Sequence, residues 1–118
     1  MDVKGLSENL GLEEDEFLDL VELFVETSAS NLNDLEKALE SGDAEGVVKA
    51  SHSLKGAAGN LGFQEIYEFS KNIEMNARQG TLGGSKEAAH SIREKLALIE
   101  EDLKKGLVKK RKNLDIFF

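Results

Sequence analysis

The 118-residue sequence contains no cysteine and no proline. Without cysteine, the chain has no disulfide framework, no thiolate zinc site and no cysteine nucleophile, as is usual in a reducing cytoplasm. We expect no signal peptide or membrane span either, because residues 1–11 are mixed and acidic rather than a basic start followed by an apolar run. We therefore expect a soluble cytoplasmic protein that does not enter a membrane.

The charge of the chain is unevenly distributed. Residues 1–103 hold 9 Lys/Arg against 22 Asp/Glu, whereas residues 104–118 hold 6 against 1. An acidic body argues against nucleic acid as the main partner, since phosphate neutralisation needs a basic face. The basic end either is the solvated end of a helix, where cations suit the helix dipole, or attracts an acidic partner or nucleic acid.

Four amphipathic runs separated by short turns fill most of the chain. We expect helices over about 13–40, from an Asp43 cap to Gly62, over 64–79, and from about Lys86 after a Ser85 cap. Apolar or small residues recur at helical spacing in each run. They are Phe17, Val21, Phe24, Ser28, Leu32, Leu35 and Leu39; Val47, Leu54, Ala58 and Leu61; Ile66, Phe69, Ile73 and Ala77; and Ala89, Ile92, Leu96, Ile99 and Leu103.

Helices joined by short loops must pack beside their neighbours, so the pattern predicts an all-α, antiparallel up-down four-helix bundle. We place the bundle at residues 1–106 and a basic, aromatic tail at 107–118. A weaker signal at residues 6–10 allows a short extra N-terminal helix capped by Ser7. The sequence leaves open whether the terminal segment Leu114–Phe118 docks on the bundle or binds a partner.

The most informative segment is a glycine-rich helix that carries a histidine, Ala50-Ser51-His52-Ser53-Leu54-Lys55-Gly56-Ala57-Ala58-Gly59-Asn60-Leu61-Gly62. Positions three and four apart share a helical face, so His52, Lys55, Gly56 and Gly59 form one stripe. Each interior glycine costs about 1 kcal/mol relative to alanine, and a cost with no evident structural gain points to function.

A hairpin between the second and third helices supplies further site residues. If it turns near Gly62-Phe63, residue numbers that sum to about 126 lie at one height, which places Glu74 opposite His52. Lys71 and Arg78 are its helical neighbours. A carboxylate that accepts a hydrogen bond from one ring N–H leaves the other nitrogen free as a nucleophile, and a nearby lysine suits an incoming phosphoryl group.

The segment His52–Gly62 closely resembles the signature of histidine-containing phosphotransfer (HPt) domains, the relay modules of two-component phosphorelays. The resemblance implies that His52 carries a phosphoryl group between receiver-domain aspartates, that Lys55 helps to hold it, and that Gly56 is bare for docking. Glu74 falls where relatives place a glutamine or glutamate that hydrogen-bonds the imidazole. We therefore assign His52 as phosphoacceptor, Lys55 as phosphoryl-stabilising and Glu74 as the orienter of the ring.

Receiver domains of response regulators or hybrid histidine kinases are the implied partners. We expect them to dock around His52 and Lys55, on a face that includes Glu45, Val48, Lys49, Gly56, Gly59, Lys71 and Arg78. The resemblance implies that this chain, a monomer, is a carrier and not an enzyme, because it has no ATP-binding kinase domain. It needs no cofactor of its own, since the receiver supplies Mg²⁺.

Two other functions fit the same pattern. The chain could be a helical adaptor that binds a receiver or kinase without accepting phosphate, or a phosphoacceptor domain cut from a chemotaxis-type or hybrid histidine kinase. His90 has no lysine or glycine at helical spacing after it, so we interpret it as a surface residue. We expect no metal site of His52 and His90, because two imidazoles without a third ligand bind zinc poorly.

Overall fold

The computed structural model describes the backbone of residues 1–115 and the side chains of residues 1–109. The described part is all-α, as predicted, with five helices and no strand. The helices are α1 (Val3–Asn9), α2 (Glu14–Ser41), α3 (Ala44–Leu61), α4 (Gln64–Arg78) and α5 (Ser85–Asp115). Of the terminal segment Leu114–Phe118, residues 116–118 and all the side chains lie outside the described part. Across the described chain, no helix combines the length and apolar character that a bilayer span requires.

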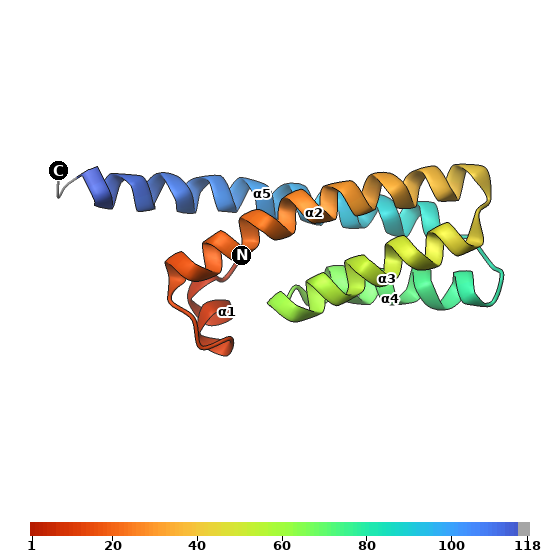
Figure 1. The fold of residues 1–118 in the computed structure, drawn as a ribbon, viewed down its shortest axis with the longest axis horizontal. Helices are drawn as coiled ribbons and strands as arrows, with labels where there is room; N and C mark the ends of the chain where they lie inside the picture. The colour runs from red at the N-terminus through yellow and green to blue at the C-terminus, as the bar shows by residue number, and fades with distance from the viewer. Residues whose placement is uncertain (116–118) are drawn as a thin grey trace.

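The four long helices pack in a ring around one core. α2 contacts α3 and α5, and α4 contacts the same two helices, while α1 packs on α2. Figure 1 shows the long helices side by side, with the last part of α5 running past the others. The ring arrangement brings α3 and α4 together as neighbours on one side of the molecule.

The core is built from the predicted stripes. On α2 every predicted position is buried, from Phe17 to Leu39, and Ser28 is buried among the apolar residues. Phe69 and Ile99 are the two predicted core residues that are only half-buried. The helical period in the sequence therefore identified the face that each helix buries.

The turns on either side of α3 use the expected capping chemistry. Asp43 caps the helix, because its carboxylate accepts a hydrogen bond from the Gly46 N–H at 3.1 Å. Gly42 and Gly62 end α2 and α3 with φ values of 69° and 83°, the left-handed region that glycine enters without strain.

Two predicted caps are wrong. α1 begins earlier than expected, because the Asp2 carboxylate accepts from Gly5 N–H at 3.0 Å and caps it. Ser7 is buried inside that helix, where its hydroxyl donates to the Lys4 carbonyl oxygen at 3.0 Å. Ser85 is the first residue of α5 and is also buried, so it lies inside the helix instead of capping it. Both serines have the residue type of a cap, but each is a buried residue of its helix.

The turn between α3 and α4 is anchored in the core. Phe63 is 8% exposed, and its ring centroid lies 4.9 Å from that of Phe24 and 6.5 Å from that of Phe17. A bulky residue held between two aromatic rings leaves the hairpin little freedom to slide. This anchor fixes which residues of α3 and α4 face each other.

The proposed domain boundary at residue 106 lies inside a continuous helix. α5 runs through Gly106 without a break, and Leu107 packs against the core. A Cβ at Gly106 would lie 3.1 Å from Leu18 Cδ2, so this glycine allows α5 to approach α2 closely.

Candidate functional site

The hairpin brings His52 and Glu74 into direct contact. Nδ1 of His52 lies 2.9 Å from Oε2 of Glu74, which confirms the juxtaposition that the residue count predicted. The imidazole is exposed over 62% of its side-chain area, whereas the Glu74 side chain is only 5% exposed. A solvent-facing ring is thus held from behind by a buried carboxylate.

Glu74 binds two cations as well as the ring. Lys55 Nζ lies 2.7 Å from Oε1, and the Arg78 guanidinium donates to Oε2 through Nη2 at 2.7 Å and Nε at 3.1 Å. The spacing of three between His52 and Lys55 and of four between Glu74 and Arg78 puts each pair on one helical face. The buried carboxylate is therefore compensated on both oxygens.

The carboxylate of Glu74 is ionised over the physiological range. Burial raises its pKa, but hydrogen bonds from Lys55, Arg78 and His52 and the charge of Lys55 lower it more, to about 2 from an ordinary value of 4.5. An ionised carboxylate only accepts hydrogen bonds, so the ring hydrogen must lie on Nδ1. In the neutral imidazole, Nε2 then keeps its lone pair and faces solvent.

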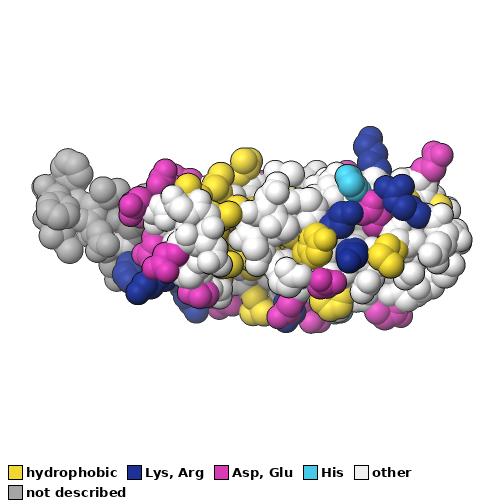
Figure 2. Space-filling view, turned by 90° about the horizontal axis from the view of Figure 1, so that it is seen from below, with side chains coloured by type: hydrophobic (Ala, Val, Ile, Leu, Met, Phe, Trp, Pro, Cys, Tyr) yellow, Lys and Arg dark blue, Asp and Glu magenta, His cyan; other side chains and the backbone are white. Residues whose placement is uncertain are grey.

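The remaining predicted docking residues surround this cluster. Lys49, Gly56 and Lys71 are exposed, and Val48 is half-buried at the edge of the core. Neither Lys49 nor Lys71 forms an ion pair among residues 1–109. Figure 2 shows Lys and Arg side chains gathered around a histidine on this side of the molecule. The site is locally basic on a chain of net charge −8.

The two glycines of the stripe have different surroundings. A Cβ on Gly56 would have no neighbour within 4 Å, so this position is open. A Cβ on Gly59 would lie 3.2 Å from Cδ2 of Tyr67, on α4. The absence of a side chain at Gly59 therefore serves the close approach of α3 and α4, and its docking role stays a prediction.

An apolar groove near the site was not predicted. Its volume is about 490 Å³, and Leu23, which borders it, is 60% exposed. The groove is lined by Leu10, Leu12, Leu20, Leu23, Phe24, Thr27, Ala57, Asn60 and Leu61. Leu20 and Leu23 on the outward face of α2 were the available signal, since they fall outside the apolar stripe that enters the core.

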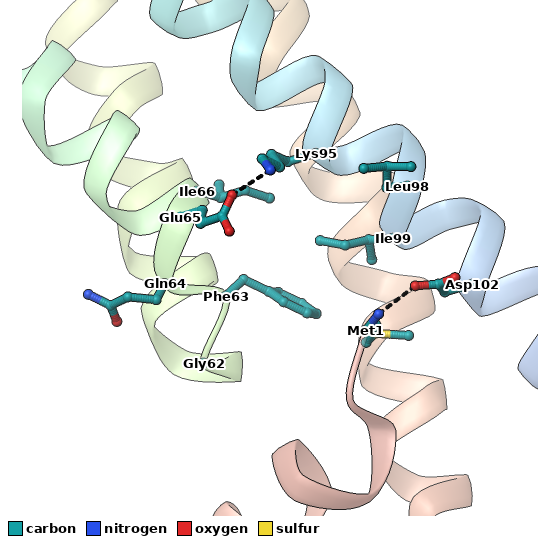
Figure 3. A pocket seen from close by; sticks show the side chains of 10 residues that line it. All are labelled: Met1, Gly62, Phe63, Gln64, Glu65, Ile66, Lys95, Leu98, Ile99 and Asp102. Carbon is teal, nitrogen blue, oxygen red and sulfur yellow. Dashed lines mark hydrogen bonds and ion pairs between the residues drawn. The ribbon is translucent and has the colours of Figure 1, made fainter.

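A second hollow, between the start of α4 and α5, has no comparable chemistry. It has a volume of about 300 Å³ and is closed on two sides by ion pairs, Lys95 with Glu65 at 2.6 Å and the Met1 amine with Asp102 at 2.6 Å (Figure 3). No histidine lines it. His90 is a surface residue, as predicted, with Nε2 2.8 Å from Oε1 of Glu94 and a side chain 71% exposed.

Comparisons with known proteins agree with this geometry. The profile of the Hpt domain family matches residues 19–104, well over half of the chain. Comparison with curated protein sequences finds no significant match. Among solved structures, the fold is similar to histidine-containing phosphotransfer protein B (HptB) from Pseudomonas aeruginosa PAO1, with 29% sequence identity and a TM-score of 0.77. The match covers 86% of this chain and 88% of HptB. The chain thus belongs to the Hpt domain family and is a histidine phosphotransfer protein of a phosphorelay, a carrier of phosphoryl groups.

Proposed function

We propose that Nε2 of His52 accepts a phosphoryl group from the aspartate of one receiver domain and passes it to the aspartate of another. The observation that carries this proposal is the 2.9 Å contact of Nδ1 with the buried Glu74 carboxylate, beneath a ring that is 62% exposed. The contact fixes the tautomer whose free nitrogen faces solvent. Family membership supports this assignment, and the ring of four helices fits the up-down bundle expected for the family.

In the transfer step, the Nε2 lone pair forms a bond to phosphorus while the acyl P–O bond of the aspartyl phosphate breaks and the carboxylate leaves. The ring keeps its Nδ1 hydrogen and becomes a cation, which the negative charge of Glu74 stabilises. Lys55 shares that carboxylate with His52, so its ammonium group lies beside the ring, where it can attract phosphoryl oxygens. The Mg²⁺ ion of the reaction belongs to the partner receiver, and the carrier acts as a monomer.

The docking surface in this proposal includes the apolar groove as well as the residues around His52. The α3 residues that line the groove follow His52 by five to nine positions, or about 8–13 Å along the helix. A standard protein interface covers about 800 Å² on each partner, a disc of roughly 16 Å radius. A receiver that docks over Nε2 is therefore wide enough to reach the groove, and the proposal places part of it there, with Gly56 leaving clearance between the two.

Phosphoryl transfer from a ³²P-labelled receiver tests the assignment. The chain should gain an acid-labile, base-stable label that His52→Gln abolishes. His90→Gln is the matched control and should be labelled as fast as the wild type, because this histidine has no buried carboxylate behind it. Label that survives His52→Gln refutes the assignment, and binding of the receiver without any label would identify a helical adaptor.

A further inference from the structure

Arg78 is a surface cation that is tied to the buried carboxylate of the site. Its guanidinium donates two hydrogen bonds to Oε2 of Glu74, the same oxygen that accepts from His52. Arg78 itself is exposed over 58% of its side chain, so it is a charge held at the open edge of the site. It donates to the oxygen that orients the imidazole and forms no hydrogen bond with the imidazole itself.

A carboxylate without cation partners at this position would also stabilise a protonated imidazole. A proton on Nε2 gives the ring the same positive charge as a phosphoryl group on Nε2, so a full negative charge beside Nδ1 stabilises both forms. The protonated ring has no lone pair on Nε2 and cannot accept phosphate. A carboxylate that orients the ring therefore also tends to inactivate it, unless cations reduce its field.

We propose that Arg78 is a positioning residue that balances the charge of Glu74, so that the carboxylate orients the imidazole without favouring a proton on Nε2. This inference rests on the proposed function of His52. The charged groups that face Glu74 are His52 and Lys55 from α3 and Arg78 from its own helix. Lys71 lies one turn earlier on α4 and makes no ion pair with Glu74, and no charged side chain among the described residues of α5 pairs with it.

The structure separates the contribution of Arg78 from that of Lys55. Lys55 is 27% exposed, binds the other carboxylate oxygen and lies on the helix that carries His52, so its loss would also remove a cation from the phosphoryl site. Arg78 can be changed with less disturbance of α3. It is therefore the residue on which the charge balance can be tested by itself.

The experiment measures phosphorylation of His52 by phosphoramidate as a function of pH. This small donor transfers its phosphoryl group to Nε2 with loss of ammonia and needs no docking surface, so a failed receiver assay and a failed charge balance give different results. For Arg78→Gln, we expect the acidic limb of the rate profile to move to higher pH by roughly 0.5–1 unit. Arg78→Lys, which keeps one cation, should stay close to the wild type.

A double-mutant cycle separates charge balance from a structural effect. Glu74→Gln keeps a carbonyl oxygen that accepts from Nδ1 but removes the charge, so adding Arg78→Gln to it should leave the acidic limb in place. Arg93→Gln is the matched control, because Arg93 pairs with Glu36 on the surface between α5 and α2. NMR titration of the ring protons should show the Arg78→Gln shift at His52 and none at His90.

An acidic limb that does not move in Arg78→Gln overturns the proposal. An equal shift in the Glu74→Gln background also overturns it, since the effect would then not pass through the carboxylate. If phosphoramidate does not label His52 at all in the wild type, the proposed function fails before the charge balance is tested.

Discussion

The side chain of Glu74 illustrates how one residue can organise a site at the surface of a small protein. It is buried, yet it is ionised because three donors from two helices reach its two oxygens. Removing one partner of a buried carboxylate costs more than an exposed ion pair contributes, because the remaining charge is left without compensation. The geometry of His52 thus depends on a group that itself depends on α3 and α4 being folded together.

The lowered pKa of Glu74 predicts a specific pH dependence of stability. A carboxyl group with a pKa of about 2 in the folded state and 4.5 in the unfolded state stabilises the fold fully above pH 4.5. That contribution is lost as the pH falls from about 4.5 to about 2. Between pH 6 and pH 3, the wild type should lose about 2 kcal/mol more of its free energy of unfolding than Glu74→Gln does.

Urea denaturation of both proteins at the two pH values measures this difference. The other acidic groups titrate equally in the two proteins and therefore cancel in the comparison. Equal losses in wild type and Glu74→Gln would show that the ion pairs of Glu74 do not stabilise the folded state.

At the scale of the element, α3 contains two glycines that share one helical stripe in the sequence but have different surroundings in the fold. Gly56 has open space where a side chain would begin, whereas Gly59 faces the Tyr67 ring of α4. Both glycines lower the helix propensity of α3, but only Gly59 contributes to packing, because its missing side chain leaves room for the Tyr67 ring. The open position at Gly56 therefore remains without a structural explanation inside this chain.

Alanine substitutions distinguish the two glycines. Gly56→Ala should raise the free energy of unfolding by about 1 kcal/mol, since it restores helix propensity and meets no neighbour. Gly59→Ala should gain much less, because its Cβ would press on Tyr67 from 3.2 Å and force the ring or helix to shift. Thermal and urea unfolding measure both values, and an equal gain for the two variants would contradict the packing role of Gly59.

Helix positions followed closely from local sequence. The period of apolar residues, the Asp43 cap and the stop at Gly62 placed the bounds of α2 and α3 within a residue or two. The caps assigned to Ser7 and Ser85 were wrong because serine suits both a helix start and a buried position, and only tertiary packing separates the two. The groove beside α3 was missed because no single helix contains it.

At the scale of the whole molecule, the His52 face is asymmetric. Lys55 and Arg78 bind the carboxylate that holds the histidine, and the apolar groove lies further along α3, between this helix and α2. An apolar patch rimmed by polar residues is typical of a protein interface. The hollow between the start of α4 and α5 is bordered instead by ion pairs, and no histidine lines it.

Substitution of two similarly exposed leucines, one in the groove and one on α5, tests whether the groove belongs to the docking surface. Leu23 in the groove is 60% exposed, and Leu98 on α5 is 57% exposed. Leu23→Ser should slow phosphoryl transfer from a receiver roughly tenfold, the effect of losing about 1.4 kcal/mol of contact. Leu98→Ser should leave the rate unchanged. Labelling by phosphoramidate should be the same in both variants, because that donor does not use the groove.

Equal receiver transfer by the two variants would exclude the groove from the docking surface. A loss in both receiver and phosphoramidate assays for Leu23→Ser would point to a disturbed site instead of a lost contact. The paired assay therefore reports on docking and on chemistry separately.

The sequence by itself determined the helices, the faces that they bury and the His52, Lys55, Gly56 stripe, because these depend on spacing along one chain. It also placed Glu74 opposite His52, since in a tight helical hairpin the number of residues from the turn determines which positions of the two helices lie side by side. The tertiary structure decided what the count could not: that Glu74 is buried with two cations as well as the ring, that Gly59 accommodates Tyr67, and that Leu23 borders a groove. Those features depend on side chains from different helices meeting in three dimensions, and the anchored turn at Phe63 sets that meeting.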